Sequence, residues 1–429
     1  MKLYSRDTQT QVKHMILTQY LDTWCGIIFN PKMRYLAKQR LSSGQRFDPH
    51  FVYVDCFSSI GRYAGDKHRS SDMVEGSPII GIRALDRLVE STRKDEIPIR
   101  VNSILIEKDR KIYQGLLETL SIYEYANRVR ETNDFACLRP GEIAVLNADA
   151  TKLVEKLVGY TTSGFTWAFY LLDPYGAGIP YDFVCPIVRQ EHHDVMINFI
   201  YEDLSRKAGM ARSDKVGAQQ RQQVENWTAV FGNEEWKNTE QEVRQAMHQA
   251  TDSSDNEESK RVERALVDRY NHVLRRMDPT LAVKLVDLQF PEKERTMFYL
   301  FLTTHDPTGA LSLNKTLYNA KLWEQEIRSV RRLSKEMEET GQMAFFSAQE
   351  HLAEPTAPPR PTNDVIASDI LKRFSGKIAT RREVYRELVN EEYFPEEIDK
   401  ALGLLKKRNK AHFEGSLSHD KPPIQFSKS

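Results

Sequence analysis

The feature that most constrains this chain is an alternation, beginning near residue 51, of short apolar runs with amphipathic stretches. The runs are rich in valine, isoleucine and aromatic residues, a composition typical of buried strands. The stretches between them repeat apolar residues at helical spacing. This alternation predicts an α/β fold in which helices cover both faces of a parallel sheet. The strands are expected near 51–55, 99–106, 143–147, 166–172 and 194–200.

Two later strand-like runs, 281–290 and 296–305, are separated only by PEKER. So short a link cannot hold a crossover helix, so we expect an antiparallel hairpin that completes the sheet. The sequence therefore predicts a doubly wound sheet of seven strands. Helix starts are expected at Ser77-Pro78, Asp109 and Pro180, which have the chemistry of N-caps and first turns.

Length and cysteine content restrict the class of protein. A chain of 429 residues is too long for one compact core, so we expect at least two domains. The four cysteines, Cys25, Cys56, Cys137 and Cys185, form no CxxC pair, which argues against structural zinc and favours reduced thiols. The first residues lack the apolar core of a signal peptide, and no window approaches roughly eighteen apolar residues. We therefore expect a cytoplasmic protein with no membrane partner.

The middle and the end of the chain differ in composition from the strand-rich part. Residues 201–275 are polar and predict a helical insertion whose acidic run, 251–260, is an exposed loop. That insertion either shapes a substrate cleft or is a structural appendage. A proline-rich linker is expected at 346–363. It would separate a main domain, 1–345, from a second domain, 364–429.

The second domain has the pattern of a helix-turn-helix followed by a wing. Thr380 and Glu383 form a capping-box pattern at the start of one helix. The last helix ends in a cluster of cations that phosphates of DNA or RNA could neutralise. Cations are also favoured at any helix C-terminus by the dipole, so a solvated helix end explains the cluster equally well. The cluster consists of Lys406, Lys407, Arg408 and Lys410.

Polar residues close each of the five parallel runs. Because the carboxyl ends of parallel strands meet at one edge of a sheet, these side chains are expected to converge where ligands bind in such folds. Taken singly, each acid could be a helix cap or a solvated side chain. The residues are Asp55, Glu107, Asp149, Asp173 and Asn198.

Chemistry gives these positions different tasks. A carboxylate at the position of Glu107 can accept both hydroxyls of a ribose, and Asp149 can accept an exocyclic amine. Proline removes a donor from the turn after Asp173, so the carboxylate and the Pro174 carbonyl could hold a substrate amine. Tyr175 offers a face on which a base can stack.

The segments FVYVDCFSSIGRY, SILIEKD, FYLLDPYGAGIPYDFV and FYLFLTTHDPTG carry a family resemblance. In the order and the residues of these segments the chain, over roughly residues 8–330, resembles the three-Cys-motif partner (TcmP) family. That family is similar to class I S-adenosylmethionine-dependent methyltransferases, which have a Rossmann-like seven-stranded sheet whose last strand is antiparallel. The resemblance implies S-adenosylmethionine as cofactor and a three-Cys-motif protein as partner.

The resemblance also implies site residues. At positions of this sequence that match the family, we expect a loop against the cofactor, an acid for the ribose, an acid beside the adenine and a catalytic Asp-Pro-Tyr loop. Lys13 and His14 match a region of the family that lines the cleft. Ser59 and Ile60 stand where the family loop has its first glycine and a proline, which puts catalysis in doubt. The implied cofactor-binding residues are Asp55, Phe57, Ser58, Gly61, Glu107, Asp149 and Asp173, and the implied catalytic residues are Asp173, Pro174 and Tyr175.

Three functions follow from these patterns. The first is a methyltransferase acting on an amino nitrogen, in particular that of a nucleic acid base. The second is a catalytically inactive partner or regulator that binds nucleic acid or protein through the C-terminal domain. The third, a Mg²⁺ nuclease, is disfavoured because four acids at four strand ends are too dispersed for a compact metal site.

Overall fold

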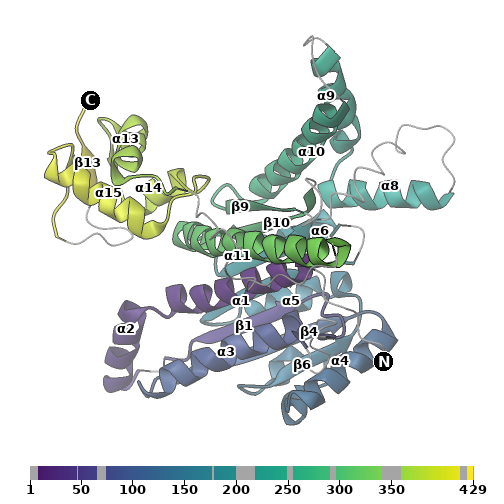
Figure 1. Ribbon diagram of the computed structural model, residues 1–429. Helices are drawn as coiled ribbons and strands as arrows, with labels where there is room; N and C mark the ends of the chain where they lie inside the picture. The colour runs from purple at the N-terminus through teal and green to yellow at the C-terminus, as the bar shows by residue number, and fades with distance from the viewer. Residues whose placement is uncertain are drawn as a thin grey trace. The chain divides into compact units, whose positions relative to one another are not determined.

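The computed structural model describes residues 8–45, 47–64, 74–175, 178–199, 218–248, 255–289, 296–340, 359–415 and 423–428. The chain divides into two compact units. The first comprises Met1–Gln9 and Ile28–His305, and the second comprises Thr10–Ile27 and Asp306–Ser429. Figure 1 shows both units, with the sheet of the first and the small C-terminal domain of the second.

A large, mostly parallel sheet of the Rossmann-like kind forms the centre of the first unit. Its strand order is β5-β6-β4-β1-β7-β8-β10-β9. All seven predicted strands are present, and the two-residue edge strand β5 is the one member of this described sheet that was not predicted. The strands are β1 (His50–Asp55), β4 (Arg100–Glu107), β5 (Val129–Arg130), β6 (Ile143–Asn147), β7 (Thr166–Leu172), β8 (His193–Phe199), β9 (Ala282–Gln289) and β10 (Thr296–Thr304).

The strand order reverses at the middle of the sheet. From β1 the chain moves outward to β4 and β6 on one side and then to β7 and β8 on the other, all in parallel register. The switch point therefore lies between β1 and β7, which is where ligands bind in such sheets. The predicted hairpin is confirmed, because β10 is antiparallel both to β9 and to β8. The PEKER turn lies outside the described residues.

Helices cover both faces of the sheet, as the alternation predicted. On one face, helix α3 (Ser77–Arg93) packs on β1 and β4, and its Gly81 lies against the ring of Tyr53. The other face shares one core with two further helices, α5 (Val154–Thr161) and α6 (Tyr181–Val188). A fourth helix, α4 (Arg110–Ile122), contacts β4 and β6.

Two of the three predicted helix starts are confirmed, and one is wrong. Asp109 caps α4 by accepting the Ile112 N–H at 2.9 Å, and Pro180 immediately precedes α6, as expected. The prediction for Ser77 was wrong: the N-cap of α3 is Gly76, which has no capping side chain. The Ser77 hydroxyl instead hydrogen-bonds the carboxyl group of Asp55.

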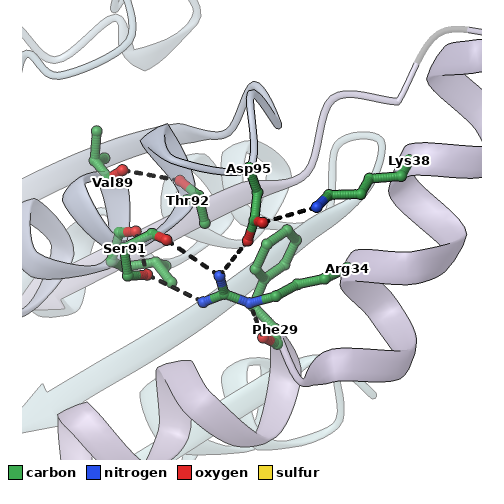
Figure 2. A network of polar contacts seen from close by, with 8 residues as sticks. Phe29, Arg34, Lys38, Val89, Ser91, Thr92 and Asp95 are labelled. Atoms are coloured by element: carbon green, nitrogen blue, oxygen red, sulfur yellow. Dashed lines mark hydrogen bonds and ion pairs between the residues drawn. The ribbon is translucent and has the colours of Figure 1, made fainter.

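Helix α2 (Pro31–Ser42) is fastened to the C-terminal end of α3 by a polar network that Figure 2 shows. Asp95 accepts from Arg34 Nη1 at 2.7 Å and from Lys38 Nζ at 2.8 Å. The same guanidinium donates to the carbonyls of Phe29 and Ser91 at 3.2 and 3.1 Å. Arg34 of α2 therefore contacts Phe29 ahead of α2, Ser91 of α3 and the acid that follows α3.

The insertion between β8 and β9 is helical where it is described, as predicted, and it shares the core of the sheet. Helices α8 (Ala218–Phe231) and α10 (Asp255–Met277) contribute buried aromatic side chains, and α9 (Thr239–His248) packs against α10. Tyr270 stacks on Phe199 of β8 with ring centroids 4.5 Å apart. The expected exposed acidic loop was wrong for 255–260, which begin α10, and 251–254 lie outside the described residues.

The second unit contains the long helix α11 (Pro307–Thr340) and a small C-terminal domain with its own core. The order along the domain is helix, strand, helix, helix, strand, strand. The predicted capping box of Thr380 and Glu383 is confirmed. Linker residues 346–358 lie outside the described part, so the domain limits stay a prediction. The elements are α13 (Asn363–Phe374), β11 (Ile378–Ala379), α14 (Arg381–Glu387), α15 (Pro395–Lys407), β12 (Ala411–His412) and β13 (Ile424–Phe426).

Across the described residues, no helix combines the length and the apolarity that crossing a membrane would require.

Candidate functional site

The loop that follows β1 is fastened to the strand on each side of it. Ser58 donates its N–H to the carbonyl of Ile106 at 2.9 Å, and its hydroxyl oxygen accepts the Ile106 N–H at 3.0 Å. On the other side, Cys56 N–H donates to the carbonyl of Leu171 at 3.1 Å. The loop therefore has a fixed position at the carboxyl edge of the sheet, next to the switch point.

Two residues of this loop adopt the left-handed backbone conformation. Ser59 has a φ of +52° and Gly61 a φ of +75°. A side chain is disfavoured at such φ values, so Ser59 carries a conformational cost that a glycine would avoid. A Cβ at Gly61 would also lie 3.0 Å from Cδ1 of Leu116. Gly61 is therefore required both by its conformation and by the space around it.

Glu107 at the end of β4 joins this loop to its own. Its Oε2 accepts the Ser59 N–H at 3.0 Å, and its Oε1 accepts the Asp109 N–H at 2.8 Å. A carboxylate has about four lone-pair sites, so two backbone donors leave capacity for further hydroxyl donors. The structure thus brings two predicted site segments, the β1 loop and Glu107, into direct contact.

Asp149 follows β6 and is held by its neighbours. Lys108 Nζ forms an ion pair with Asp149 Oδ2 at 2.8 Å, and Thr151 donates its hydroxyl to Oδ1 at 2.7 Å. Burial raises the pKa of this carboxyl, but these hydrogen bonds outweigh it and hold the pKa below its usual value. Asp149 is therefore an ionised acceptor whose Lys108 partner was not predicted.

Asp55 is fully buried at the end of β1, with hydrogen bonds on several sides. Its carboxyl group accepts the Phe57 N–H at 3.2 Å and the Tyr53 hydroxyl at 3.3 Å. Burial raises the pKa of Asp55 to about 7, the Ser77 and Phe57 hydrogen bonds oppose this rise, and the charge of nearby Asp173 adds to it. Asp55 therefore changes protonation near neutral pH and holds the loop from inside.

Asp173 immediately follows β7 and is oriented by β8. Asn198 Nδ2 donates to Asp173 Oδ1 at 2.6 Å. Pro174 is buried, whereas the side chain of Tyr175 is fully exposed. Gly176 lies outside the described residues. The proline whose carbonyl would hold an amine is therefore buried, and the ring that would stack on a base is exposed.

Besides Lys108, sequence reasoning missed Tyr53 and Ser77 at this edge. The signal for Tyr53 was its spacing, because residues two apart on a strand share a face and Tyr53 precedes Asp55 by two. No comparable signal marks Ser77, whose contact with Asp55 depends on where α3 begins.

Three further predicted residues are Phe57, which belongs to the loop after β1, and Lys13 and His14, which lie elsewhere. Phe57 is half-buried against the main core. Lys13 and the buried His14 belong to helix α1 (Thr8–Ile28), in the part assigned to the second compact unit. In the described residues, no group of three or more His, Cys, Asp or Glu side chains is placed to hold a metal ion.

Comparison with known proteins adds little. No family model matches the chain, and no curated protein matches it. Among solved structures, protein LPL1258 from Legionella pneumophila, of family DUF519, is 12% identical and has a TM-score of 0.30, over 70% of this chain and 85% of that one.

A second similar structure is that of a protein assigned as a sarcosine dimethylglycine methyltransferase from Galdieria sulphuraria. It is 7% identical and has a TM-score of 0.22, over 64% of this chain and 85% of that one. Both TM-scores are too low to carry an argument about function, so the functional reading depends on the residues at the carboxyl edge of the sheet.

Proposed function

We propose that the first compact unit binds S-adenosylmethionine and transfers a methyl group to an amino nitrogen, in particular that of a nucleic acid base. The observation that carries this proposal is the contact between Ser59 N–H and Glu107 Oε2, 3.0 Å, beside the switch point. It joins a backbone loop suited to a nucleoside cofactor to an acid suited to a ribose.

The residues present fit the cofactor. The remaining lone pairs of Glu107 can accept ribose hydroxyls, and Asp149 is ionised and can accept an exocyclic amine. The loop would meet the cofactor with its backbone, and Gly61 keeps the conformation that the loop needs. Two features oppose the fit: the side chain of Ser59 occupies a position better suited to glycine, and two backbone N–H groups already donate to the Glu107 carboxylate.

When bound, S-adenosylmethionine supplies a methyl group activated by a sulfonium leaving group. The chain contributes position and hydrogen-bond acceptors. The Asp173 carboxylate, oriented by Asn198, and the Pro174 carbonyl accept the N–H bonds of the substrate and direct its lone pair. The proton that the nitrogen loses can pass to Asp173 or to water, and Tyr175 stacks on the base.

Calorimetry with S-adenosylmethionine tests binding. Glu107→Ala is expected to weaken binding by about tenfold to a hundredfold, the range for hydrogen bonds to a charged group. Glu107→Gln keeps an acceptor, so its affinity for the cofactor should lie between those of the parent protein and Glu107→Ala. Glu155→Ala, which removes an exposed acid of α5, is the matched control. A folded protein that takes up no cofactor at millimolar concentration would end the proposal.

A second function is favoured by the strain at Ser59 and by the two backbone donors already bound to Glu107. In it the fold is a catalytically inactive scaffold, and the C-terminal domain is a winged helix that binds nucleic acid or a protein such as a three-Cys-motif partner. The supporting observation is the helix-strand-helix-helix-strand-strand order. Salt-dependent nucleic acid binding that persists in Asp173→Ala, without cofactor binding in the parent protein, would favour this function.

A further inference from the structure

The small sheet of the C-terminal domain has one outward face. Its order is β11-β13-β12, and Ile378 and His412 both pair with Gln425. These three side chains are exposed, while their strand neighbours Ala379, Ile424, Ala411 and Phe426 are buried. Because directly paired residues point to the same side, the exposed three form a row across the sheet.

The row continues beyond the regular strands. Ser427 N–H donates to the carbonyl of Lys410 at 3.0 Å, and Gly376 N–H donates to the carbonyl of Ser427 at 3.3 Å. By the two-residue period, Lys410 and Ser427 point to the same side as His412 and Gln425. The stem of Lys428 covers Gly376, since a Cβ there would lie 3.1 Å from Lys428 Cγ. Lys410 therefore extends the row, and Lys428 lies beside Gly376 at the same end of the sheet.

We call the strand face the outward row of Ile378, Lys410, His412 and Gln425 together with three exposed lysines near it in the sequence, Lys377, Lys407 and Lys428. The alternation of the strands turns Lys377 and Lys428 to the opposite side, so they belong to the margin of the row. All seven side chains are exposed. Within the described part of the chain, its four lysines form no ion pair, and one of them, Lys377, has its Nζ 6.0 Å from the centre of the Phe374 ring, a cation–π contact. Glu414, two residues beyond His412, is an exposed acid at the far end of β12. The strand face thus concentrates unpaired positive charge at one end of the domain.

The helix-end cluster predicted from sequence is less available than the strand face. Arg408 forms an ion pair with Asp364 at 2.6 Å. Lys406 Nζ lies 4.5 Å from the centre of the Phe413 ring, a cation–π contact. Of the predicted four, Lys407 and Lys410 form no ion pair or cation–π contact with another described residue, and both belong to the strand face.

The opposite end of α15 is acidic. In a helix-turn-helix, the first residues of the recognition helix contact the base edges. Here the first turn of α15 carries Glu396 and Glu397, and Asp399 follows it. These acids pair with Lys315, Arg360 and Arg381 at 3.4, 2.6 and 2.7 Å. Placing these carboxylates in a nucleic acid groove would set them against phosphates and break the existing pairs.

We infer that the strand face binds the phosphate backbone of a nucleic acid and that the first turn of α15 stays outside the groove. This deepens the proposed nucleic acid partner and is independent of methyl transfer. Lysines act as point charges on phosphates and read no sequence, so binding is expected to be strongly salt-dependent and weakly sequence-specific.

Fluorescence anisotropy of the full chain with labelled duplex DNA, duplex RNA and single-stranded DNA, over a series of salt concentrations, tests this. The triple variant Lys377→Ala, Lys410→Ala, Lys428→Ala should lower the salt slope by about 0.9 for each duplex phosphate that it no longer neutralises. The triple variant Lys32→Ala, Lys94→Ala, Lys156→Ala, made at exposed lysines of the first unit, changes the charge equally and is the matched control.

Opposite changes at acids locate the contact. Glu414→Lys should tighten binding, whereas Glu396→Gln should leave it unchanged. Equal binding by the two lysine triples, tighter binding by Glu396→Gln, or no salt-dependent binding to any of the three nucleic acids would overturn the inference. The arm with the tightest binding identifies the nucleic acid. Cofactor calorimetry on the strand-face triple, expected to match the parent protein, separates this outcome from failure of the cofactor proposal.

Discussion

At the scale of single residues, the loop after β1 shows how side chains and backbone divide the work of holding a site. Ser58 and Asp55 turn inward and bind the ends of neighbouring strands and the loop itself. Ser59 and Gly61 offer backbone conformation rather than side-chain chemistry. The shape of the loop therefore depends as much on a backbone conformation that favours glycine at position 59 as on the polar groups of the loop.

Replacing Ser59 with glycine tests that view. Removing the Cβ at a φ of +52° relieves a cost of about 1 kcal/mol, partly offset by the greater entropy of glycine in the unfolded chain. The free energy of unfolding, measured in urea, should rise by up to about 1 kcal/mol. Ser58→Gly is the control. Its free energy of unfolding should fall, because the substitution removes the hydroxyl that accepts the Ile106 N–H. A lower free energy of unfolding in Ser59→Gly would contradict the view that the backbone at Ser59 is strained.

Asp55 predicts a pH dependence of stability. Its pKa is 3.8 in the unfolded chain and about 7 in the fold, so between these values the folded state binds more protons. Stability from this group is therefore full below pH 3.8 and lost as the pH rises to about 7, by up to about 4 kcal/mol. The difference in unfolding free energy between the parent protein and Asp55→Asn, followed from pH 4 to 8, should show this decline; a flat difference would contradict it.

Sequence reasoning identified the polar strand ends because parallel strands place their carboxyl ends together whatever the loops do. It could not identify their partners. Lys108 meets Asp149 across 41 residues of sequence, and Tyr53 reaches the Ser77 carbonyl across 24. Such contacts depend on the exact angle and start of each helix, which hydrophobic periodicity does not specify.

At the scale of elements, α3 packs on β1 with no room for a side chain at Gly81. A Cβ on Gly81 would lie 2.1 Å from Cε1 of the buried Tyr53 ring. Gly81→Ala should therefore destabilise the protein by about 1–3 kcal/mol through overpacking. Gly159→Ala, in α5, meets nothing within 4 Å and should stabilise by about 0.5–1 kcal/mol. Thermal unfolding of both variants checks this, and equal shifts would contradict the close contact.

The helical insertion predicts a second effect on stability. Tyr270 of α10 is buried and stacks on Phe199 of the sheet, so Tyr270→Ala should cost about 3–5 kcal/mol, as for other large aromatic truncations. Arg264→Ala, an exposed position on the same helix, should stay within about 0.5 kcal/mol. Urea unfolding measures both, and a small effect at Tyr270 would mean that the insertion is an appendage after all.

The elements themselves were largely predictable, and the misses have physical causes. β5 has two residues, too few to show any period. The acidic run was mistaken for a loop because serine and aspartate favour turns, yet acids are also stabilised at a helix N-terminus by the dipole, and α10 begins there.

At the scale of the whole molecule, the equal totals of 61 basic and 61 acidic residues hide a separation of charge. The C-terminal domain is acidic where α15 begins and basic on the strand face. Net charge therefore gave no warning of a local field. Nor could composition reveal that Thr10–Ile27 belongs to the same compact unit as the end of the chain, because an amphipathic helix does not specify its partner.

The division into two units predicts how the protein unfolds. Each unit has a hydrophobic core of its own, so calorimetric unfolding should show two transitions. S-adenosylmethionine at a hundred times its Kd should stabilise the first unit by about 2.7 kcal/mol and leave the other transition in place. A single transition that shifts as a whole would show instead that the units unfold together.

The position of β10 between β8 and β9 also has a consequence for biosynthesis. A ribosome releases β9 before β10, and within the sheet β9 pairs with β10 alone. The exposed edge of β9 therefore waits, unpaired, until Thr304 has emerged. The wait is longer for Thr10–Ile27, whose unit is completed only by residues made after Asp306. Synthesis that stops before β10 therefore leaves β9 with an open edge, and synthesis that stops before Asp306 leaves Thr10–Ile27 without the rest of its unit.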